Sequence, residues 1–167
     1  MNEYLHHTRL FRDEEEWRKL MTLLPEGHIN ALSVGCSTGE EVFTLAYFLS
    51  LRSYFVIGID TNDACINRAK QGLAELPEQY EEEFGHVTKF HVGFKQAAFP
   101  CPVEPSPNLV VCRYVMQYQT NKDEFAKALV NATSPGGLIF MGANPDELLT
   151  LYSDDVKPLA DRIFLRL

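Results

Sequence analysis

The sequence predicts an α/β fold in which helices cover both faces of a mostly parallel sheet. Two short runs, Tyr54–Ile59 and Asn108–Cys112, are almost wholly apolar, as strands are when both faces of their sheet are covered. Segments with the helical spacing of apolar residues separate these runs, which is typical of parallel β-α-β connections. The last residues, Arg162–Leu167, alternate between polar and apolar side chains and predict an antiparallel strand at the C-terminus.

The chain has 167 residues, 46% of them apolar and 23% charged, which is the size and composition of one globular domain, 1–167. No apolar run reaches the ~18–20 residues of a membrane span, and the polar N-terminus lacks the apolar core of a signal peptide. We therefore expect a cytoplasmic protein without membrane insertion. The net charge of −8 and the scattered basic residues disfavour nucleic acid as a partner.

The first half of the chain alternates between helices and strands. Trp17, Leu20, Met21 and Leu24 have the i, i+3, i+4, i+7 spacing of one buried helix face. The segment Glu40–Leu51 is apolar almost all round, which predicts a deeply buried helix. In chain order we expect helix Asp13–Leu24, strand Asn30–Gly35, turn Cys36–Gly39, helix Glu40–Leu51, strand Tyr54–Ile59 and helix Asn62–Leu73.

The second half begins with an acidic segment, Glu75–Gly85, that we expect to be irregular, and a weakly alternating strand, Val87–Phe94. Four prolines predict that Phe99–Pro107 is a loop. The remaining predicted elements are strand Asn108–Cys112, helix Lys122–Thr133, strand Leu138–Met141, short helix Asp146–Leu151 and hairpin Val156–Leu167. With both strands of the hairpin, the predicted sheet has seven strands.

Cysteines and histidines give little sign of metal or disulfide chemistry. Cys36, Cys65, Cys101 and Cys112 form no CxxC pair, and no histidine cluster has metal-ligand spacing. We therefore expect no metal site. Four cysteines could form disulfides, but we do not expect them, because the core of an intracellular chain of this length does not depend on covalent cross-links. The tandem His6–His7 belongs to a solvated N-terminal segment in this interpretation.

The main candidate for a binding site is the stretch SVGCSTGEE, where the first predicted strand turns into a helix. Gly35 and Gly39 let the backbone approach a ligand closely, and the amides at a helix N-terminus favour an anion such as a carboxylate. Asp60 ends the next strand, where an acidic residue of a doubly wound fold accepts hydrogen bonds from ribose hydroxyls. The alternative is a plain β-α-β packing turn, which would not require Asp60.

Two phosphate-binding patterns fit this turn less well. The dinucleotide fingerprint is G-x-G-x-x-G, whereas Gly35 and Gly39 are spaced as G-x-x-x-G, and no Gly-Lys-Ser/Thr of a Walker loop follows. The fourth strand continues into CRYVMQYQ, which puts Arg113 and Tyr118 at the mouth of the same crevice. A tyrosine at this place is also compatible with a plain aromatic at the rim.

Five motifs, taken in order, resemble the CheR-type chemotaxis receptor methyltransferases over residues 8–150. The catalytic domain of that family reads T-x-FFR, AGCSTGEEPYS, ATDID, FCRNVxIYF and PGGxLFLGHSE. The corresponding stretches here are TRLFR, VGCSTGEEVFT, GIDTND, VCRYVMQYQ and PGGLIFMGANP. GCSTGEE is the specific stretch, whereas PGG is generic. These enzymes transfer a methyl group from S-adenosylmethionine to glutamate carboxylates and leave S-adenosylhomocysteine.

The resemblance implies a Rossmann-like class I methyltransferase fold with S-adenosyl-L-methionine as its cofactor. It assigns Gly35 and Gly39 to the methionine end of the cofactor, Glu41 to the amino group or a nearby hydroxyl, and Asp60 to the ribose. Arg113 lies at the arginine with which the family contacts the cofactor. The cofactor-binding residues that we expect are Gly35, Cys36, Ser37, Thr38, Gly39, Glu41, Asp60, Thr61, Gly93, Phe94, Arg113 and Tyr114.

Arg12 and Tyr118 match the two residues that the family places near the transferred methyl group and the acceptor carboxylate. A sulfonium methyl is already electrophilic and a carboxylate is already nucleophilic, so alignment and removal of water suffice. A guanidinium can bind a carboxylate in a planar, bidentate way, and a tyrosine hydroxyl can orient the second carboxylate oxygen. The alternative for Arg12 is a plain surface arginine.

The chain also departs from the family pattern. Seven residues precede Thr8, where the family carries a helical N-terminal domain, and Glu75–His86 is too short for its β-subdomain. We therefore expect the catalytic domain only, and the face left by the N-terminal domain suggests self-association as a homo-oligomer. Tyr114 and Gly93 stand where the family has asparagines.

Three functions stay open at this point. The leading one is an S-adenosylmethionine-dependent methyltransferase whose acceptor is a protein carboxylate or a small molecule. The second is a catalytically weak or inactive cofactor-binding or assembly module derived from the same family. The third, an NAD-binding oxidoreductase, is supported by the predicted fold alone.

Overall fold

A computed structural model describes residues 10–84, 91–142, 145–151 and 154–167. The strands are β1 (Ile29–Val34), β2 (Tyr54–Asp60), β3 (Val92–Gln96), β4 (Leu109–Cys112), β5 (Leu138–Met141), β6 (Val156–Ala160) and β7 (Ile163–Arg166). The helices are α1 (Glu14–Leu23), α2 (Glu40–Leu49), α3 (Asp63–Phe84), α4 (Lys122–Ala132), α5 (Pro145–Leu151) and the short 3-10 helix η2 (Met116–Tyr118).

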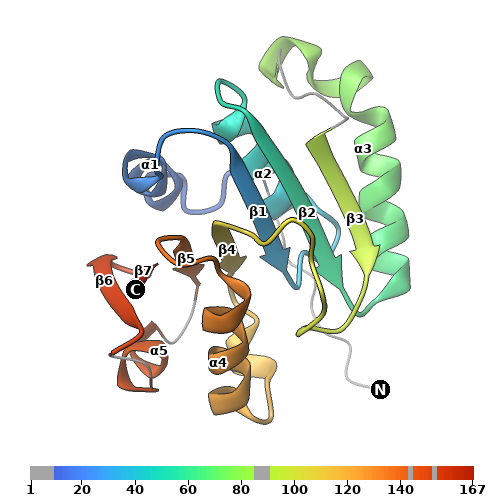
Figure 1. Ribbon diagram of the computed structural model, residues 1–167. Coiled ribbons are helices and arrows are strands. Elements are labelled where there is room, and N and C mark those ends of the chain that lie inside the picture. Colours follow the sequence, from blue (N-terminus) through green and yellow to red (C-terminus); the bar gives the residue numbers. More distant parts are fainter. Residues whose placement is uncertain (1–9, 85–90, 143–144, 152–153) are drawn as a thin grey trace.

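The strands form one seven-stranded sheet in the order β3-β2-β1-β4-β5-β7-β6 (Figure 1). The neighbours from β3 to β5 pair in parallel, and β7 pairs antiparallel with both β5 and β6. The mostly parallel, seven-stranded α/β sheet with an antiparallel C-terminal strand is thereby confirmed.

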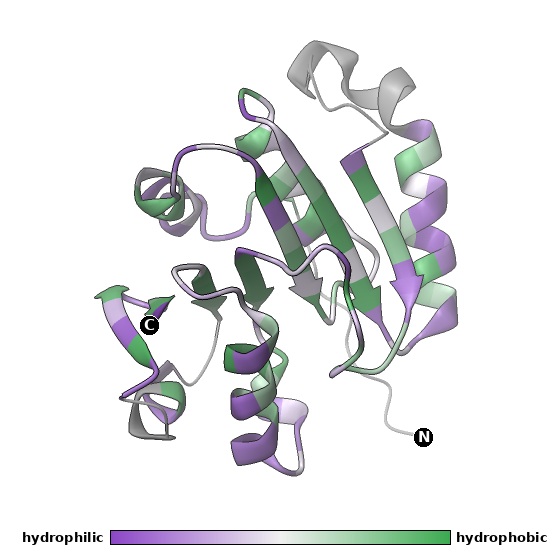
Figure 2. Ribbon diagram, viewed as in Figure 1, coloured by the Kyte–Doolittle hydropathy of each residue, from purple (hydrophilic) through white to green (hydrophobic). Residues whose placement is uncertain are grey.

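Successive residues of the central strands point into two cores on opposite faces of the sheet. On one face Leu109 and Phe140 pack with buried residues of α1, α2 and α3. On the other face Val110 and Ile139 pack with buried residues of α4 and α5. Because both faces are covered, β4 and β5 consist of apolar residues throughout, and much of β2 is green in Figure 2.

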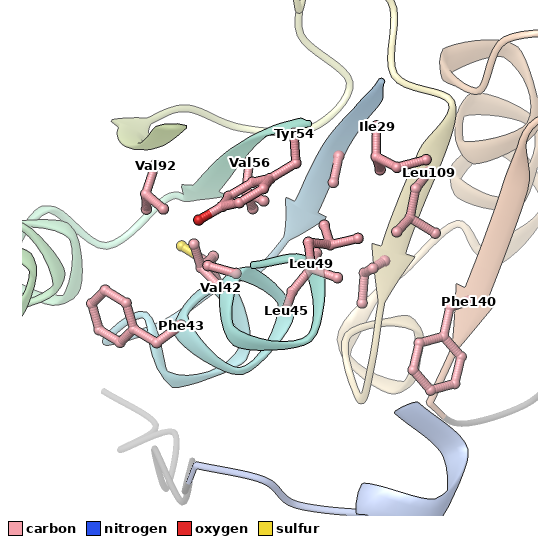
Figure 3. Packing of buried hydrophobic residues seen from close by; sticks show 14 of the residues in the cluster. Ile29, Val42, Phe43, Leu45, Leu49, Tyr54, Val56, Val92, Leu109 and Phe140 are labelled. Carbon is pink, nitrogen blue, oxygen red and sulfur yellow. The ribbon is translucent and has the colours of Figure 1, made fainter. Parts of the chain in front are cut away.

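The helix α2 lies directly against the sheet. Its residues Val42, Leu45 and Leu49 are fully buried and face Ile29 and Val56 of the strands (Figure 3). Since α2 follows the glycine turn after β1, this packing also fixes the turn at the carboxyl end of the sheet.

Two expectations for the second half need correction. The acidic segment expected to be irregular is helical, since α3 continues to Phe84. Glutamate and glutamine are good helix formers, and Pro77 does not end the helix. Strand β3 runs to Gln96 because it pairs with the whole end of β2, up to the Asp60–Gln96 pair. Residues 87–90 of the expected strand, and Gly85, lie outside the described residues.

Three further observations concern the cysteines, metal-binding groups and membrane-spanning helices. The four cysteines are free thiols. Within the described ranges, no group of three His, Cys, Asp or Glu side chains is placed to hold a metal ion. No helix within the same ranges is long and apolar enough to cross a membrane.

Two glycines of adjacent strands provide a test of this packing. A Cβ added at Gly58 would lie 2.7 Å from Val42 Cγ2 and 2.8 Å from Cys36 Sγ, whereas one at Gly93 would meet nothing closer than Phe55 Cζ at 3.9 Å. We expect Gly58→Ala to lower the free energy of unfolding by about 1–3 kcal/mol through overpacking. Gly93→Ala should leave it unchanged or raise it by up to about 1 kcal/mol. Urea denaturation measures both values, and the reverse ranking would contradict the packing between α2 and β2.

Candidate active site

A cavity of about 840 Å³ opens at the carboxyl ends of β1, β2 and β4. Strand β1 lies between β2 and β4: the chain passes from β1 to β2 and β3 on one side and then crosses back to β4 on the other, so the strand order reverses at β1. Doubly wound sheets bind ligands at such a switch point. Among the predicted site residues, ten line this cavity: Arg12, Gly35, Cys36, Ser37, Glu41, Asp60, Thr61, Arg113, Tyr114 and Tyr118.

The glycine turn forms one wall of the cavity. The amides of Gly35 and Cys36 both donate to Ile59 O, at 2.8 and 3.0 Å, and so tie the end of β1 to the end of β2. Gly35 has a φ of 71°, and a Cβ there would lie 2.5 Å from Val115 Cγ2. Only glycine combines this conformation with this close approach, which leaves bare backbone beside the cavity.

Asp60 connects the two loops that border the cavity. Its Oδ2 accepts a hydrogen bond from Ser37 N at 2.9 Å, and its Oδ1 accepts one from Asn62 N at 2.9 Å. Each carboxylate oxygen has two lone pairs, so Asp60 can still accept hydrogen bonds from the hydroxyls of a ligand.

Glu41 lies in the first turn of α2, and its side chain is 14% exposed. Its Oε1 accepts a hydrogen bond from Ser33 Oγ at 2.7 Å, while its Oε2 is 4.0 Å from Arg113 Nη1. Burial raises the pKa of Glu41, and this effect outweighs the opposite effects of Arg113 and Ser33. Glu41 is therefore a carboxylate that a cationic ligand group would stabilise.

Arg113 follows β4 and is a buried cation, with a side chain only 4% exposed. Its Nη2 pairs with Asp13 Oδ2 and lies 3.9 Å from Glu16 Oε2, and its Nη1 faces Glu41. Its Cζ is 5.1 Å from the ring centroid of Trp17. Desolvating a charge costs several kcal/mol, so the close ion pair with Asp13 is needed to keep the guanidinium inside the fold.

Arg12 lies on the ring of Tyr114, with the guanidinium carbon 4.0 Å from the ring centroid. The contact is a cation–π interaction, which holds the plane of the guanidinium at the edge of the cavity. The Arg12 side chain is 41% exposed, so its outer face is open to an incoming molecule.

Tyr118 ends the short helix η2 and is 56% exposed. It lines the same cavity as Arg12, although the two residues are more than a hundred positions apart in the chain. The structure thus brings together the two residues predicted to act on the acceptor. Thr8 and Arg9, which open the corresponding motif, lie outside the described residues.

Thr38 and Gly39 were expected at the cofactor but do not line the cavity. Thr38 Oγ1 donates to the carboxylate oxygens of Glu40 at 2.6 and 2.8 Å. Gly39 has a φ of 97°, and a Cβ there would lie 3.0 Å from Phe94 Cζ. Both residues belong to the turn but do not border the cavity, and their contact with a cofactor stays a prediction.

Gly93 and Phe94 lie within β3, before its end, and do not line the cavity either. The residues that follow the strand line it instead, namely Ala97, Ala98 and Phe99. We missed them because the third strand was expected to end at Phe94. The available signal was the Ala-Ala-Phe sequence itself, which puts two small side chains and one aromatic at the carboxyl end of a strand.

Other lining residues were not expected at the site: Trp17, Val34, Thr44, Ile59, Asn62, Val115, Gln117, Gln119 and Phe125. All except Trp17 and Phe125 lie within the family motifs, and those motifs were the signal that could have identified them. Two of the aromatic residues act together, since the rings of Phe99 and Phe125 meet edge to face with centroids 5.3 Å apart. They give the β3 side of the cavity an apolar wall suited to a flat ring.

The lining fits S-adenosylmethionine in chemistry. The carboxylates of Glu41 and Asp60 suit an ammonium group and ribose hydroxyls, respectively. Gly35 leaves space that a Cβ would fill, and Phe99 with Phe125 suits an aromatic base. The volume of about 840 Å³ also lies within the range of ligand pockets, which is ~300–1,000 Å³.

Comparison with known proteins agrees with this fit. The family described as CheR methyltransferase, SAM binding domain, matches residues 6–158. A chemotaxis protein methyltransferase of Campylobacter jejuni is 40% identical over 68 residues, which are 35% of this chain and 26% of that protein. A carboxy-S-adenosyl-L-methionine synthase of Trichodesmium erythraeum is 27% identical over 112 residues, which are 66% of this chain and 40% of that protein.

Solved structures share the fold. The SAM-dependent methyltransferases of Geobacter sulfurreducens and Thiobacillus denitrificans, both in complex with S-adenosyl-L-homocysteine, superpose with a TM-score of 0.57. They are 19% and 20% identical, and the match covers 82% of this chain and 51% of each of those chains. This chain therefore spans about half of the solved chains and less than half of the curated relatives.

The fold and the site define a class I methyltransferase domain that binds S-adenosylmethionine. Within that class, the chain belongs to the CheR methyltransferase family, whose SAM-binding domain it matches over residues 6–158. The predicted family, fold class and cofactor are confirmed by these matches.

Glu41 gives a prediction on stability and pH. Since burial raises its pKa in the folded state, ionised Glu41 destabilises the fold at pH values above that pKa. Glu41→Gln should raise the free energy of unfolding at neutral pH by about 0.5–2 kcal/mol. The gain should shrink as the pH falls toward the ordinary pKa of Glu, ~4.3.

Urea denaturation of both proteins at a series of pH values measures this gain. The matched control is Glu26→Gln, which changes an exposed acid and should show no comparable trend with pH. A loss of stability in Glu41→Gln at neutral pH would contradict the account.

Proposed function

We propose that this chain is an S-adenosylmethionine-dependent methyltransferase domain that transfers a methyl group to a carboxylate acceptor. The observation that carries the proposal is that Arg12 and Tyr118 line the same cavity as Gly35, Glu41 and Asp60. Glu41, expected at the cofactor, is 14% exposed, whereas Arg12 and Tyr118, expected at the acceptor, are 41% and 56% exposed. The acceptor is a carboxylate of a protein or of a small molecule.

The chain's own residues would hold the cofactor by charge and by shape. Glu41 would bind the amino group through Oε2, because Ser33 already occupies Oε1. Asp60 would accept hydrogen bonds from the ribose hydroxyls, and the bare backbone at Gly35 would lie along the methionine part. When bound, S-adenosylmethionine supplies an electrophilic methyl group on its sulfonium.

On the acceptor side, Arg12 would bind and orient the incoming carboxylate. Its guanidinium is fixed against Tyr114, so less conformational freedom is lost when a carboxylate binds. Tyr118 would donate a hydrogen bond to the second carboxylate oxygen and direct the attacking one inward. A carboxylate with an ordinary pKa of ~4 is ionised at neutral pH, so no side chain has to remove a proton. Catalysis then rests on alignment and on exclusion of water.

The names of two relatives concern the kind of acceptor and not its chemical group. The Campylobacter jejuni relatives are chemotaxis protein methyltransferases, which suggests a protein acceptor. We propose that this chain shares the carboxylate chemistry and that its acceptor enters past Arg12 and Tyr118. Self-association of the chain stays a prediction, which a sedimentation run showing monomer alone would reject.

The proposal predicts base-labile methylation. With S-[methyl-³H]adenosylmethionine and fractions of a cell extract as acceptors, label should enter methyl esters and be released as methanol at alkaline pH. Arg12→Ala should lower the rate by about 10–100-fold, because a charge-assisted hydrogen bond contributes about 1.5–3 kcal/mol. Tyr118→Phe should lower it by about 3–10-fold, because a neutral hydrogen bond contributes about 1 kcal/mol.

The control variant is Arg18→Ala, which removes a surface arginine whose side chain pairs with Glu14. It should keep the rate of the wild type. Full activity in both Arg12→Ala and Tyr118→Phe would contradict the assigned roles. A wild-type protein that binds S-adenosylhomocysteine but transfers no label would instead favour the inactive cofactor-binding module.

A further inference from the structure

Asp13 binds two residues of the candidate site through one carboxylate oxygen. Its Oδ2 pairs with Arg113 Nη2 and accepts a hydrogen bond from Tyr114 OH at 2.8 Å. The same oxygen lies 3.8 Å from Arg12 Nε. Three site residues from two distant parts of the chain therefore lie around Asp13, for which the sequence predicts only a place at the start of a helix.

The backbone indicates that this carboxylate does not serve the helix. Asp13 is the N-cap of α1, where an aspartate side chain commonly accepts a hydrogen bond from an amide of the first turn. It makes no such bond, and its backbone is left-handed, with φ 60° and ψ 48°. Tyr114, its partner, is also left-handed, with φ 61°. Backbone strain of this kind clusters at functional sites.

The segment that carries Asp13 is fixed on both sides. Phe11 N donates to Thr44 Oγ1 of α2 at 3.0 Å, and the indole N–H of Trp17 donates to Arg12 O at 3.0 Å. The position of the Asp13 carboxylate is therefore set by α1 and α2 together.

We propose that Asp13 is a positioning residue that keeps Arg113 away from Glu41, so that Glu41 Oε2 stays available to the cofactor's amino group. The Arg113 guanidinium lies between the two carboxylates, in contact with Asp13 and 4.0 Å from Glu41 Oε2. Because Arg113 is buried, the loss of one counter-ion draws it toward those that remain. In the absence of the Asp13 charge, Glu41 and Glu16 are the carboxylates within 4.0 Å of Arg113 among the described residues.

The same carboxylate also reaches the acceptor side. Asp13 holds the hydroxyl of Tyr114, and the ring of Tyr114 supports the guanidinium of Arg12. Asp13 thus sets the position of a cofactor-side cation and of an acceptor-side cation at once. The inference rests on the proposed function in one respect, the assignment of the cofactor's amino group to Glu41.

The test is calorimetric titration with S-adenosyl-L-homocysteine, which carries the same amino group. Asp13→Asn keeps the size of the side chain and removes its charge, and we expect its dissociation constant to rise about tenfold over the wild type. The matched control is Glu14→Gln, which alters the next acid along the chain, whose side chain is 49% exposed and pairs with Arg18. The control should bind within twofold of the wild type.

The affinity separates positioning from a purely structural role. A structural role would lower the melting temperature of Asp13→Asn and leave the affinity of the folded protein unchanged. Affinity within twofold of the wild type would overturn the proposal. If Asp13→Asn does not fold, Tyr114→Phe removes the hydroxyl that Asp13 binds and should weaken binding about threefold, and unchanged affinity in that variant would also overturn the proposal.

A second readout does not depend on the cofactor. Trp17 is the single tryptophan of the chain, and its ring lies 5.1 Å from the Arg113 guanidinium carbon. Without any ligand, Asp13→Asn should change the intensity and wavelength of Trp17 emission, whereas Glu14→Gln should not. If the wild type fails to bind S-adenosylhomocysteine, the proposed function fails, and Trp17 emission then decides this inference separately. Unchanged emission in Asp13→Asn would overturn it.

Discussion

The buried guanidinium of Arg113 is the constraint on which the site depends. A charge with 4% exposure needs a close counter-ion, because its desolvation costs several kcal/mol. Asp13, just before α1, is this counter-ion, while Glu16 of α1 and Glu41 of α2 lie 3.9 and 4.0 Å from the guanidinium. The ion pair therefore fixes the N-terminal segment against the end of β4, beside α1 and α2. The cavity lies where these parts meet.

The two sides of the cavity differ in how firmly their charged side chains are held. On the inner side, Glu41 and Asp60 are held by hydrogen bonds from Ser33 and from backbone amides. On the outer side, Arg12 rests on an aromatic ring and keeps much of its surface exposed. The inner side is thus held in one arrangement and the outer side is accessible from solvent, which suits the cofactor and the acceptor of the proposed function, respectively. Tyr114 links the two, because its hydroxyl reaches Asp13 while its ring supports Arg12.

Local patterns in the sequence predict much of the fold and the glycine turn that borders the cavity. The apolar run of β2 and the glycine turn before α2 identify their elements because burial on both sheet faces leaves a direct compositional signal. The acidic part of α3 is missed because a proline and a run of glutamates resemble a loop, although glutamate favours helix. The end of β3 is missed because its length follows from pairing with β2 and not from its own residues.

The network around Asp13 could not be predicted from the sequence. Its partners Arg113 and Tyr114 are 100 and 101 positions away, and no spacing rule connects them. The left-handed backbone at Asp13 is equally hidden, since an acidic residue before a helix normally predicts a cap. Such contacts depend on tertiary packing, and only the structure reveals them.

The most direct measurement of the central claim is isothermal titration of the wild-type chain with S-adenosylhomocysteine, using NAD as the comparison ligand. We predict binding of one S-adenosylhomocysteine per chain, loss of that binding in Asp60→Ala, and no binding of NAD. Absence of binding for both S-adenosylhomocysteine and S-adenosylmethionine, or preferential binding of NAD, would contradict it.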